Sequence, residues 1–306
     1  MKFSWFYFDL ICRDDLKVVV VFYGHPFFLT FDISLLDISI YRKGKKTHYG
    51  FPVPVKDCRF QTDPINVSIS KSILKETDFG FHIDIREPGI RLKLDLSPKY
   101  SYWESEYISL FKRQNYFFNW RIPGPQLESR GFIETEQFNL PIDGIGYLDF
   151  NEGNFPLNVF VKSWVWGRIH SPSRSVVFGS LIFQDSSLYQ PVWIFNESQS
   201  RFQMSAVPLC LTPDNFSFFE DIFEDRFKIQ ENKKFDQVLF LISKLPTNWT
   251  LFRKIHEFIF YRLDEQPWGR KFNRFLANVD YQRYWLALNT AADENFIGIL
   301  ESINFK

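Results

Sequence analysis

A carboxyl group and a phenol lie two positions apart in residues 144–153, which read GIGYLDFNEG. Tyr147 and Asp149 would share one face of an extended strand, because successive side chains alternate. In a cavity lined by Phe and Trp, desolvation would raise the pKa of the Asp149 carboxyl, so that it could protonate an alkene or donate to a carbonyl. Tyr147 could donate a hydrogen bond to this acid or to a substrate oxygen. It could also be a half-buried tyrosine that only packs in the barrel wall. The stretch also suits a turn, in which Asp149 would bond its own backbone.

Two indoles and a guanidinium follow with the same period of two, at Trp164, Trp166 and Arg168. Arg168 could stack on a ring and hold a ligand carboxylate or carbonyl, or it could pair with a protein carboxylate. An aromatic face attracts a developing cation by ~0.5–2 kcal/mol. The trio therefore suits either a substrate wall or a packed interior.

Other kinds of catalytic site, and metal sites, have weaker support in the sequence. His25 follows a predicted strand and precedes Pro26, which predicts a barrel rim from which a general base could act. No two histidines have metal-ligand spacing, and the three cysteines lack any zinc spacing. No phosphate loop or nucleophile elbow occurs in the sequence. We expect no metal, no cofactor and no covalent nucleophile.

Charge and hydropathy exclude several classes of protein. The 306 residues hold 36 Lys and Arg against 36 Asp and Glu, which argues against a nucleic-acid partner. No apolar run reaches the ~18 residues that a spanning helix needs. Residues 3–12 are interrupted by Asp9 and lack a cleavage site, so they predict a buried strand. We expect a cytoplasmic chain with a small apolar substrate, which a peripheral membrane contact could supply.

Aromatic residues are unusually frequent, with 37 Phe, 13 Tyr and 9 Trp. Each ring buries on the order of 150–250 Å². The composition fits either a core rich in phenylalanine or a cavity for a large apolar ligand.

The elements that must position these residues are mainly strands. Residues 36–41, 81–86 and 90–96 alternate between apolar and polar, which predicts half-buried antiparallel strands with one wet face. Val18–Val21 predicts a strand buried on both faces. Frequent turn signals between the strands predict an all-β sandwich or barrel. Helical periodicity occurs late, near residues 214–223 and 251–262, as covers on an open barrel end.

An internal similarity divides the chain. Residues 4–10, read SWFYFDL, resemble residues 163–169, read SWVWGRI, and each is followed by a polar turn and a β-branched strand. The offset of 159 residues indicates two duplicated domains, 1–157 and 158–306, unless the match is due to chance.

Several of these motifs resemble the hydroxyneurosporene synthases, which are carotenoid hydratases. The resemblance lies in residues 5–9 with Tyr7, in 144–153 with Tyr147, Asp149 and Asn151, in 164–168 and in 298–301. It implies two tandem lipocalin-like domains with a ligand cavity near their junction. Relatives include pericyclases that fold polyene chains, so the fold does not decide the reaction.

The resemblance also implies a mechanism, in which an Asp protonates a double bond and water captures the cation. A His-x-Trp pair of the hydratases falls on residues 118–120, where Trp120 matches and Phe118 replaces the histidine. Leu148 and Phe150 flank Asp149 where polar neighbours would help to hold water. These apolar replacements weaken the prediction of a hydratase.

Three functions remain open. The first is a cofactor-independent enzyme that binds an elongated unsaturated metabolite between two β domains and cyclises or isomerises it. Asp149 and Tyr147 would assist, with Trp120, Trp164, Trp166, Arg168, Asn151, His25 and Tyr7 around the substrate. The second is hydration of an isoprenoid double bond, and the third is a non-catalytic carrier.

Overall fold

The computed structural model describes residues 2–12, 15–25, 33–100, 108–113, 115–155, 157–204, 227–237, 279–290 and 295–305. Most of these residues are in β-strands, which confirms the all-β prediction. In this part of the chain the helices are one turn, α1 (Leu157–Phe160), and one 3-10 turn, η1 (Val55–Asp57). The two predicted late helices lie outside the described residues. No helix in the described ranges is long and apolar enough to cross a membrane.

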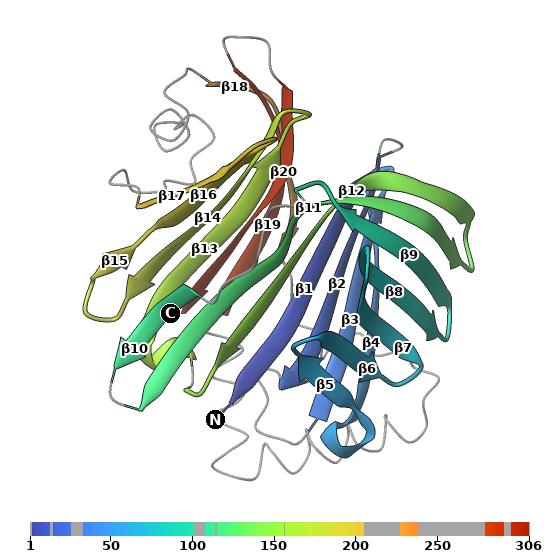
Figure 1. Cartoon of the computed structure of the whole chain (residues 1–306), viewed down its shortest axis with the longest axis horizontal. Helices are drawn as coiled ribbons and strands as arrows, with labels where there is room; N and C mark the ends of the chain where they lie inside the picture. Colours follow the sequence, from blue (N-terminus) through green and yellow to red (C-terminus); the bar gives the residue numbers. More distant parts are fainter. Residues whose placement is uncertain are drawn as a thin grey trace. The chain divides into compact units, whose positions relative to one another are not determined.

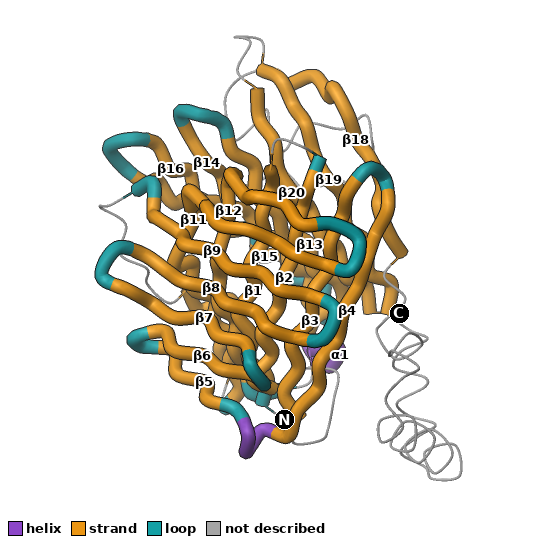
Figure 2. The backbone as a smooth tube through the Cα atoms, turned by 90° about the vertical axis from the view of Figure 1, so that its right-hand side faces the viewer, coloured by secondary structure: helices purple, strands orange, loops and turns teal. Residues whose placement is uncertain are grey.

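The first half of the chain forms one large sheet. Its order is β4-β3-β2-β1-β12-β11-β9-β8-β7-β6-β5, and β10 pairs with β11. Figure 2 shows β9 to β5 one below another as a meander. The strands are β1 (Phe3–Cys12), β2 (Leu16–His25), β3 (Ile33–Arg42), β4 (Lys45–Pro54), β5 (Arg59–Thr62), β6 (Ile65–Ile69), β7 (Ser72–Thr77), β8 (Gly80–Glu87), β9 (Ile90–Pro98), β10 (Ile108–Arg113), β11 (Tyr116–Thr135) and β12 (Asn139–Gly153).

This sheet curls around one apolar core. Alternation sends Phe6 and Phe8 of β1, and Leu148 and Phe150 of β12, to its inner face. Side chains of β2–β4 and β6–β9 join the same buried cluster, and β6–β9 lie across from β1–β4 in Figure 1. Each fully buried apolar side chain contributes about 1.5–3 kcal/mol to folding. The core therefore fixes which face of each strand points inward.

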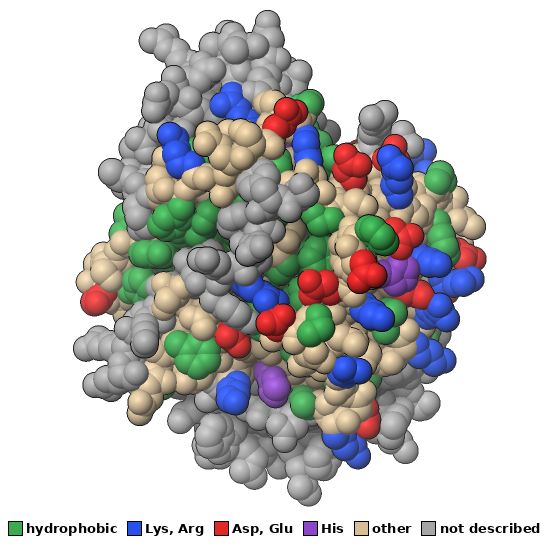
Figure 3. Space-filling view, in the orientation of Figure 1, with side chains coloured by type: hydrophobic (Ala, Val, Ile, Leu, Met, Phe, Trp, Pro, Cys, Tyr) green, Lys and Arg blue, Asp and Glu red, His purple; other side chains and the backbone are tan. Residues whose placement is uncertain are grey.

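The other face of the sheet is wet in one part and buried in another. On β9 the polar residues are exposed, as the alternation predicts, and charges of both signs are interspersed on the right of Figure 3. On β3 the prediction of a wet face is wrong, because Ser39 and Tyr41 are buried. Val18–Val21 is buried on both faces, as predicted. The outward-facing Tyr7 of β1 and Asp149 of β12 are buried as well.

A second sheet follows in the order β17-β16-β14-β13-β20-β19-β18, and β15 pairs with β14. As in the first sheet, the first strand lies between the second strand and the last. The strands are β13 (Val161–His170), β14 (Arg174–Phe183), β15 (Leu188–Tyr189), β16 (Pro191–Asn196), β17 (Ser200–Met204), β18 (Phe227–Gln237), β19 (Val279–Thr290) and β20 (Asn295–Phe305).

The chain divides into two compact units. The first is Met1–Leu157 with Ser173–Ser175 and Ile194–Arg201, and the second is Asn158–Pro172, Val176–Trp193 and Phe202–Lys306. The duplication into domains 1–157 and 158–306 stays a prediction.

Candidate functional site

The carboxyl group of Asp149 accepts three hydrogen bonds from uncharged side chains. Trp120 Nε1 donates to Oδ2 over 3.0 Å and the Tyr147 hydroxyl donates to the same oxygen over 2.9 Å. Asn151 Nδ2 donates to Oδ1 over 3.0 Å. Asp149 itself is 3% exposed, and its three partners are equally buried. These four residues, all in the first unit, are called the Asp149 cluster below.

Strand register brings the Asp149 cluster together. Tyr147, Asp149 and Asn151 lie on one face of β12, and Trp120 of β11 is paired with Asn151. Tyr7 of β1 is paired with Asp149, and the rings of Tyr7 and Tyr147 lie 6.4 Å apart, edge to face. The predicted residues Asp149, Tyr147, Trp120, Asn151 and Tyr7 therefore lie in one place.

Glycine allows the three strands to approach each other at this site. A Cβ atom at Gly146 would lie 2.7 Å from Ser129 Oγ and 2.9 Å from the Phe8 ring. A side chain at Gly144 would lie 2.6 Å from the backbone oxygen of Ile11. The Gly-x-Gly spacing before Tyr147 thus serves the close contact of β12 with its neighbours.

The environment of Asp149 suits a group that exchanges a proton. Burial opposes the ionised carboxylate, whereas hydrogen bonds from N–H and O–H donors favour it. Oδ2 accepts from both Trp120 and Tyr147, and Oδ1 accepts from Asn151, so donors hold both oxygens in place. The indole of Trp120 and the ring of Tyr7 offer aromatic surface beside this carboxyl group.

The side-chain oxygen of Asn151 accepts no hydrogen bond within the described part of the chain. Its Nδ2 bonds Asp149, while its buried Oδ1 has no hydrogen-bond partner. An unsatisfied buried acceptor costs about 1–3 kcal/mol. A water molecule or a substrate hydroxyl beside Oδ1 would remove this cost.

Two predicted neighbours lie on the wrong face. Leu148 and Phe150 belong to the inner core, so they point away from Asp149. The prediction that Leu148 and Phe150 take the place of polar partners of Asp149 is wrong, because a polar side chain at either position would face the core. Phe118 is different, since it lies on the Trp120 face, buried and edge-to-face with Phe3.

His25 lies apart from the Asp149 cluster. It ends β2, is half-buried and pairs with Ser4 of β1, away from the Tyr7–Asp149 pair. Among the described residues it has no hydrogen bond or ion pair with the cluster. Its role as a general base stays a prediction.

A second buried polar cluster lies in the second unit. Trp166 Nε1 donates to Glu301 Oε2 over 3.1 Å, and the guanidinium of Arg283 forms an ion pair with Oε1 of the same carboxylate. Arg168, also buried, bonds Nδ1 of His170, and Trp164 lies on the same face. That Trp164, Trp166 and Arg168 line one cavity with Asp149 stays a prediction.

Sequence reasoning did not identify Glu301 or Arg283 as site residues. Glu301 follows Gly298 in the closing motif, and the register pairs it with Trp166. Across the described residues, no group of three His, Cys, Asp or Glu side chains gathers as metal ligands.

Comparison with known proteins shows the fold alone. No family model and no curated protein matches the sequence. Among solved structures, the chain is similar to a protein named AttH from Nitrosomonas europaea, with a TM-score of 0.59 and 12% identity over 99% of this chain and 92% of that one. CghA in complex with Sch210972 gives a TM-score of 0.59 at 8% identity, over 100% and 89%. Kievitone hydratase from Nectria haematococca gives 0.56 at 8%, over 99% and 89%.

The similarity extends over nearly the full length of each of these proteins, so the chain has the lipocalin-like fold that its motifs predict.

Proposed function

We propose that this chain is a cofactor-independent enzyme that cyclises or isomerises an apolar, unsaturated small molecule. The observation that carries the proposal is the buried Asp149 carboxyl, held by three uncharged donors. Two structural neighbours support an enzyme that acts on a small molecule: CghA was solved with Sch210972, and kievitone hydratase is named for a hydration, the second candidate below.

The reaction runs through the carboxyl group of Asp149. In the protonated form, the O–H bond breaks as the electron pair of a substrate double bond takes the proton, which leaves a carbocation and the Asp149 carboxylate. A second double bond then attacks the cation and closes a ring, and the new cation loses a proton from an adjacent carbon to the Asp149 carboxylate. Without ring closure, the carbon next to the first cation returns a proton to Asp149 and the double bond shifts. On a substrate with a carbonyl, the same O–H donates a hydrogen bond to the carbonyl oxygen. The double bond that reacts with a diene then becomes more electrophilic.

The remaining cluster residues orient these groups. Tyr147 and Trp120 fix Oδ2 and stabilise the carboxylate that forms when the proton leaves. The aromatic surfaces of Trp120 and Tyr7 favour a nearby cation by ~0.5–2 kcal/mol. Binding an elongated chain in a folded conformation supplies the entropic part of the acceleration.

Hydration is a second candidate function, favoured by the open acceptor of Asn151. A water molecule that donates to Asn151 Oδ1 would keep a lone pair for attack on the carbocation. Its proton would then pass to the Asp149 carboxylate, so that one water is added and the acid is restored. The missing histidine at Phe118 argues against this route.

The mass of the product separates these functions. Purified protein is incubated with a panel of polyenes and prenylated aromatic compounds, and the products are analysed by chromatography and mass spectrometry. A new compound of unchanged mass supports cyclisation or isomerisation, and a gain of one water supports hydration instead. Tight binding without turnover across the panel would indicate a carrier and overturn the proposal of an enzyme.

A further inference from the structure

A cavity of about 660 Å³ opens in the first unit, and none of the four residues of the Asp149 cluster lines it. Arg121 lines this cavity, whereas its neighbour Trp120 bonds Asp149, and successive residues of a strand point to opposite faces. The volume lies within the range of ~300–1,000 Å³ that is typical of small-molecule sites. This cavity is therefore distinct from the proposed catalytic site.

The cavity contains a fixed amide that offers a donor. Gln126 is 2% exposed, and its Oε1 accepts from the Tyr100 hydroxyl over 2.9 Å and from the Ser175 hydroxyl of the same unit. In the described ranges, no acceptor takes a hydrogen bond from its Nε2. Two hydroxyl donors on Oε1 fix the amide orientation, so Nε2 is the group that remains for a ligand acceptor.

A second buried donor group also lines the cavity. The guanidinium of Arg121, 8% exposed, donates to the backbone oxygen of Thr62 and lies 5.9 Å from the centre of the Phe150 ring. Arg121 and Gln126 both line the cavity. The polar part of the cavity is therefore built for an acceptor such as a carbonyl oxygen.

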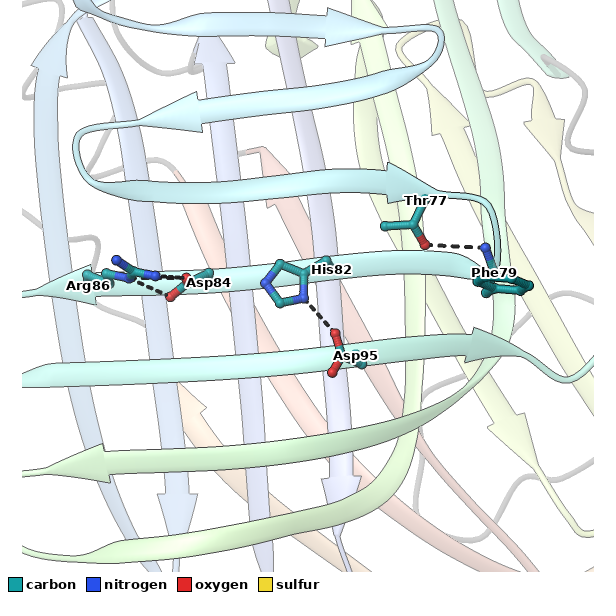
Figure 4. A network of polar contacts seen from close by, with 6 residues as sticks. All are labelled: Thr77, Phe79, His82, Asp84, Arg86 and Asp95. Atoms are coloured by element: carbon teal, nitrogen blue, oxygen red, sulfur yellow. Dashed lines mark hydrogen bonds and ion pairs between the residues drawn. The ribbon is translucent and has the colours of Figure 1, made fainter.

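The remaining walls are apolar and the rim is acidic. Phe81 and Pro125 are buried wall residues, and Phe79, at the β7–β8 turn drawn in Figure 4, is 86% exposed. Asp63, Glu76 and Asp78 are exposed on the same lining. Three carboxylates at an entrance lower the local concentration of anions. This rim favours a neutral ligand over a carboxylate or phosphate.

We infer that this cavity binds a neutral carbonyl compound, such as a ketone, amide or lactone with an aromatic or aliphatic body. Its oxygen accepts from Gln126 Nε2, and its body lies between Phe81 and Phe79. The site is separate from the proposed reaction at Asp149 and does not depend on it.

Fluorescence titration with Prodan, a neutral naphthyl ketone, tests this site. Binding to the folded chain shifts the emission to the blue, and Gln126→Glu weakens it about tenfold or more. This variant keeps an acceptor for Tyr100 and Ser175, but it replaces the donor with an oxygen that repels the ketone. Phe79→Ser removes an exposed wall and weakens binding without affecting the core, whereas Phe202→Ser, at a ring 51% exposed in the second unit, leaves binding unchanged.

Two results would overturn the inference. One is the absence of Prodan binding to the unaltered chain. The other is binding that Asp149→Asn weakens and that Gln126→Glu and Phe79→Ser leave unchanged, because the probe would then occupy the proposed catalytic site. Neither result bears on turnover, so the inference and the proposed function fail separately.

Discussion

Asp149 and Glu301 occupy equivalent positions in the two sheets. Asp149 lies on β12 opposite Tyr7 of the first strand, and Glu301 lies on β20 opposite Trp166 of β13. Tyr7 and Trp166 are the residues that the sequence similarity aligns at an offset of 159. The two carboxyls differ in the partners described above, since Trp120, Tyr147 and Asn151 donate to Asp149, whereas Arg283 forms an ion pair with Glu301. The ion pair with Arg283 distinguishes Glu301 from the proposed acid, Asp149.

The Glu301–Arg283 pair is expected to stabilise the second unit. Arg283→Met removes a guanidinium that is paired with a buried carboxylate, so the free energy of unfolding should fall by about 3–5 kcal/mol. Urea unfolding followed by circular dichroism measures this loss. The double variant Arg283→Met/Glu301→Leu should recover most of it, and a loss below about 1 kcal/mol in the single variant would contradict this role.

Tyr147 is expected to support the charge that forms on Asp149. Tyr147→Phe removes one donor to Oδ2, and hydrogen bonds to charged groups contribute about 1.5–3 kcal/mol. The kcat should therefore fall by about 10- to 100-fold, with substrate affinity little changed. Tyr49→Phe, at a half-buried tyrosine packed against the core, is the matched control. Equal kcat values for Tyr147→Phe and Tyr49→Phe would exclude the assignment.

Acid stability depends in part on Asp84 and Arg86 of β8. Arg86 Nε lies 3.0 and 3.1 Å from the two Asp84 oxygens, as Figure 4 shows, and this contact lowers the pKa of Asp84. Because the folded pKa is below the unfolded one, the pair stabilises the fold above pH ~4 and loses this effect as the pH falls further.

Thermal unfolding at several pH values checks this effect. Asp84→Asn should lower the Tm at pH 7 only slightly, since Arg86 is exposed and water screens the ion pair. The difference between the variant and the unaltered chain should vanish near pH 2. A difference that is the same at both pH values would show that the ion pair is not its cause.

Gly146 is expected to tolerate no side chain. In Gly146→Ala the new methyl group would press on Ser129 and Phe8, and overpacking of this kind costs about 1–3 kcal/mol. Urea unfolding measures the cost, and Ser129→Ala in the same chain should relieve part of it. Full stability of the single variant would mean that the strands separate more easily than their contacts indicate.

Strand periodicity predicted much of the fold and part of the Asp149 cluster. The alternation in residues 90–96 gave the exposed and buried faces of β9, and the two-residue spacing placed Tyr147 beside Asp149. The same reasoning failed at Ser39 and Tyr41, which alternate like surface residues yet are buried, because the periodicity of one strand does not show what packs against its faces.

Contacts between strands that are far apart in the sequence could not be predicted from residue spacing alone. Trp120 comes from another strand than Asp149, and only the family resemblance pointed to it. No resemblance marked Arg283, so its pairing with Glu301 went unpredicted. The cavity around Gln126 is formed by several separate segments, and each of them reads as an ordinary turn or strand end.

The kcat of Asp149→Asn, on the first substrate that the unaltered chain converts, tests the central claim most directly. Asparagine keeps the shape and the buried packing but has no acidic proton, so kcat should fall by about 10²–10⁴-fold while the Kd for substrate stays within about twofold. Asp95→Asn, at an exposed carboxyl on β9, should leave both values unchanged. A kcat for Asp149→Asn within a factor of about two of the unaltered enzyme would contradict the account, because general acid catalysis of the proposed kind is worth far more than that.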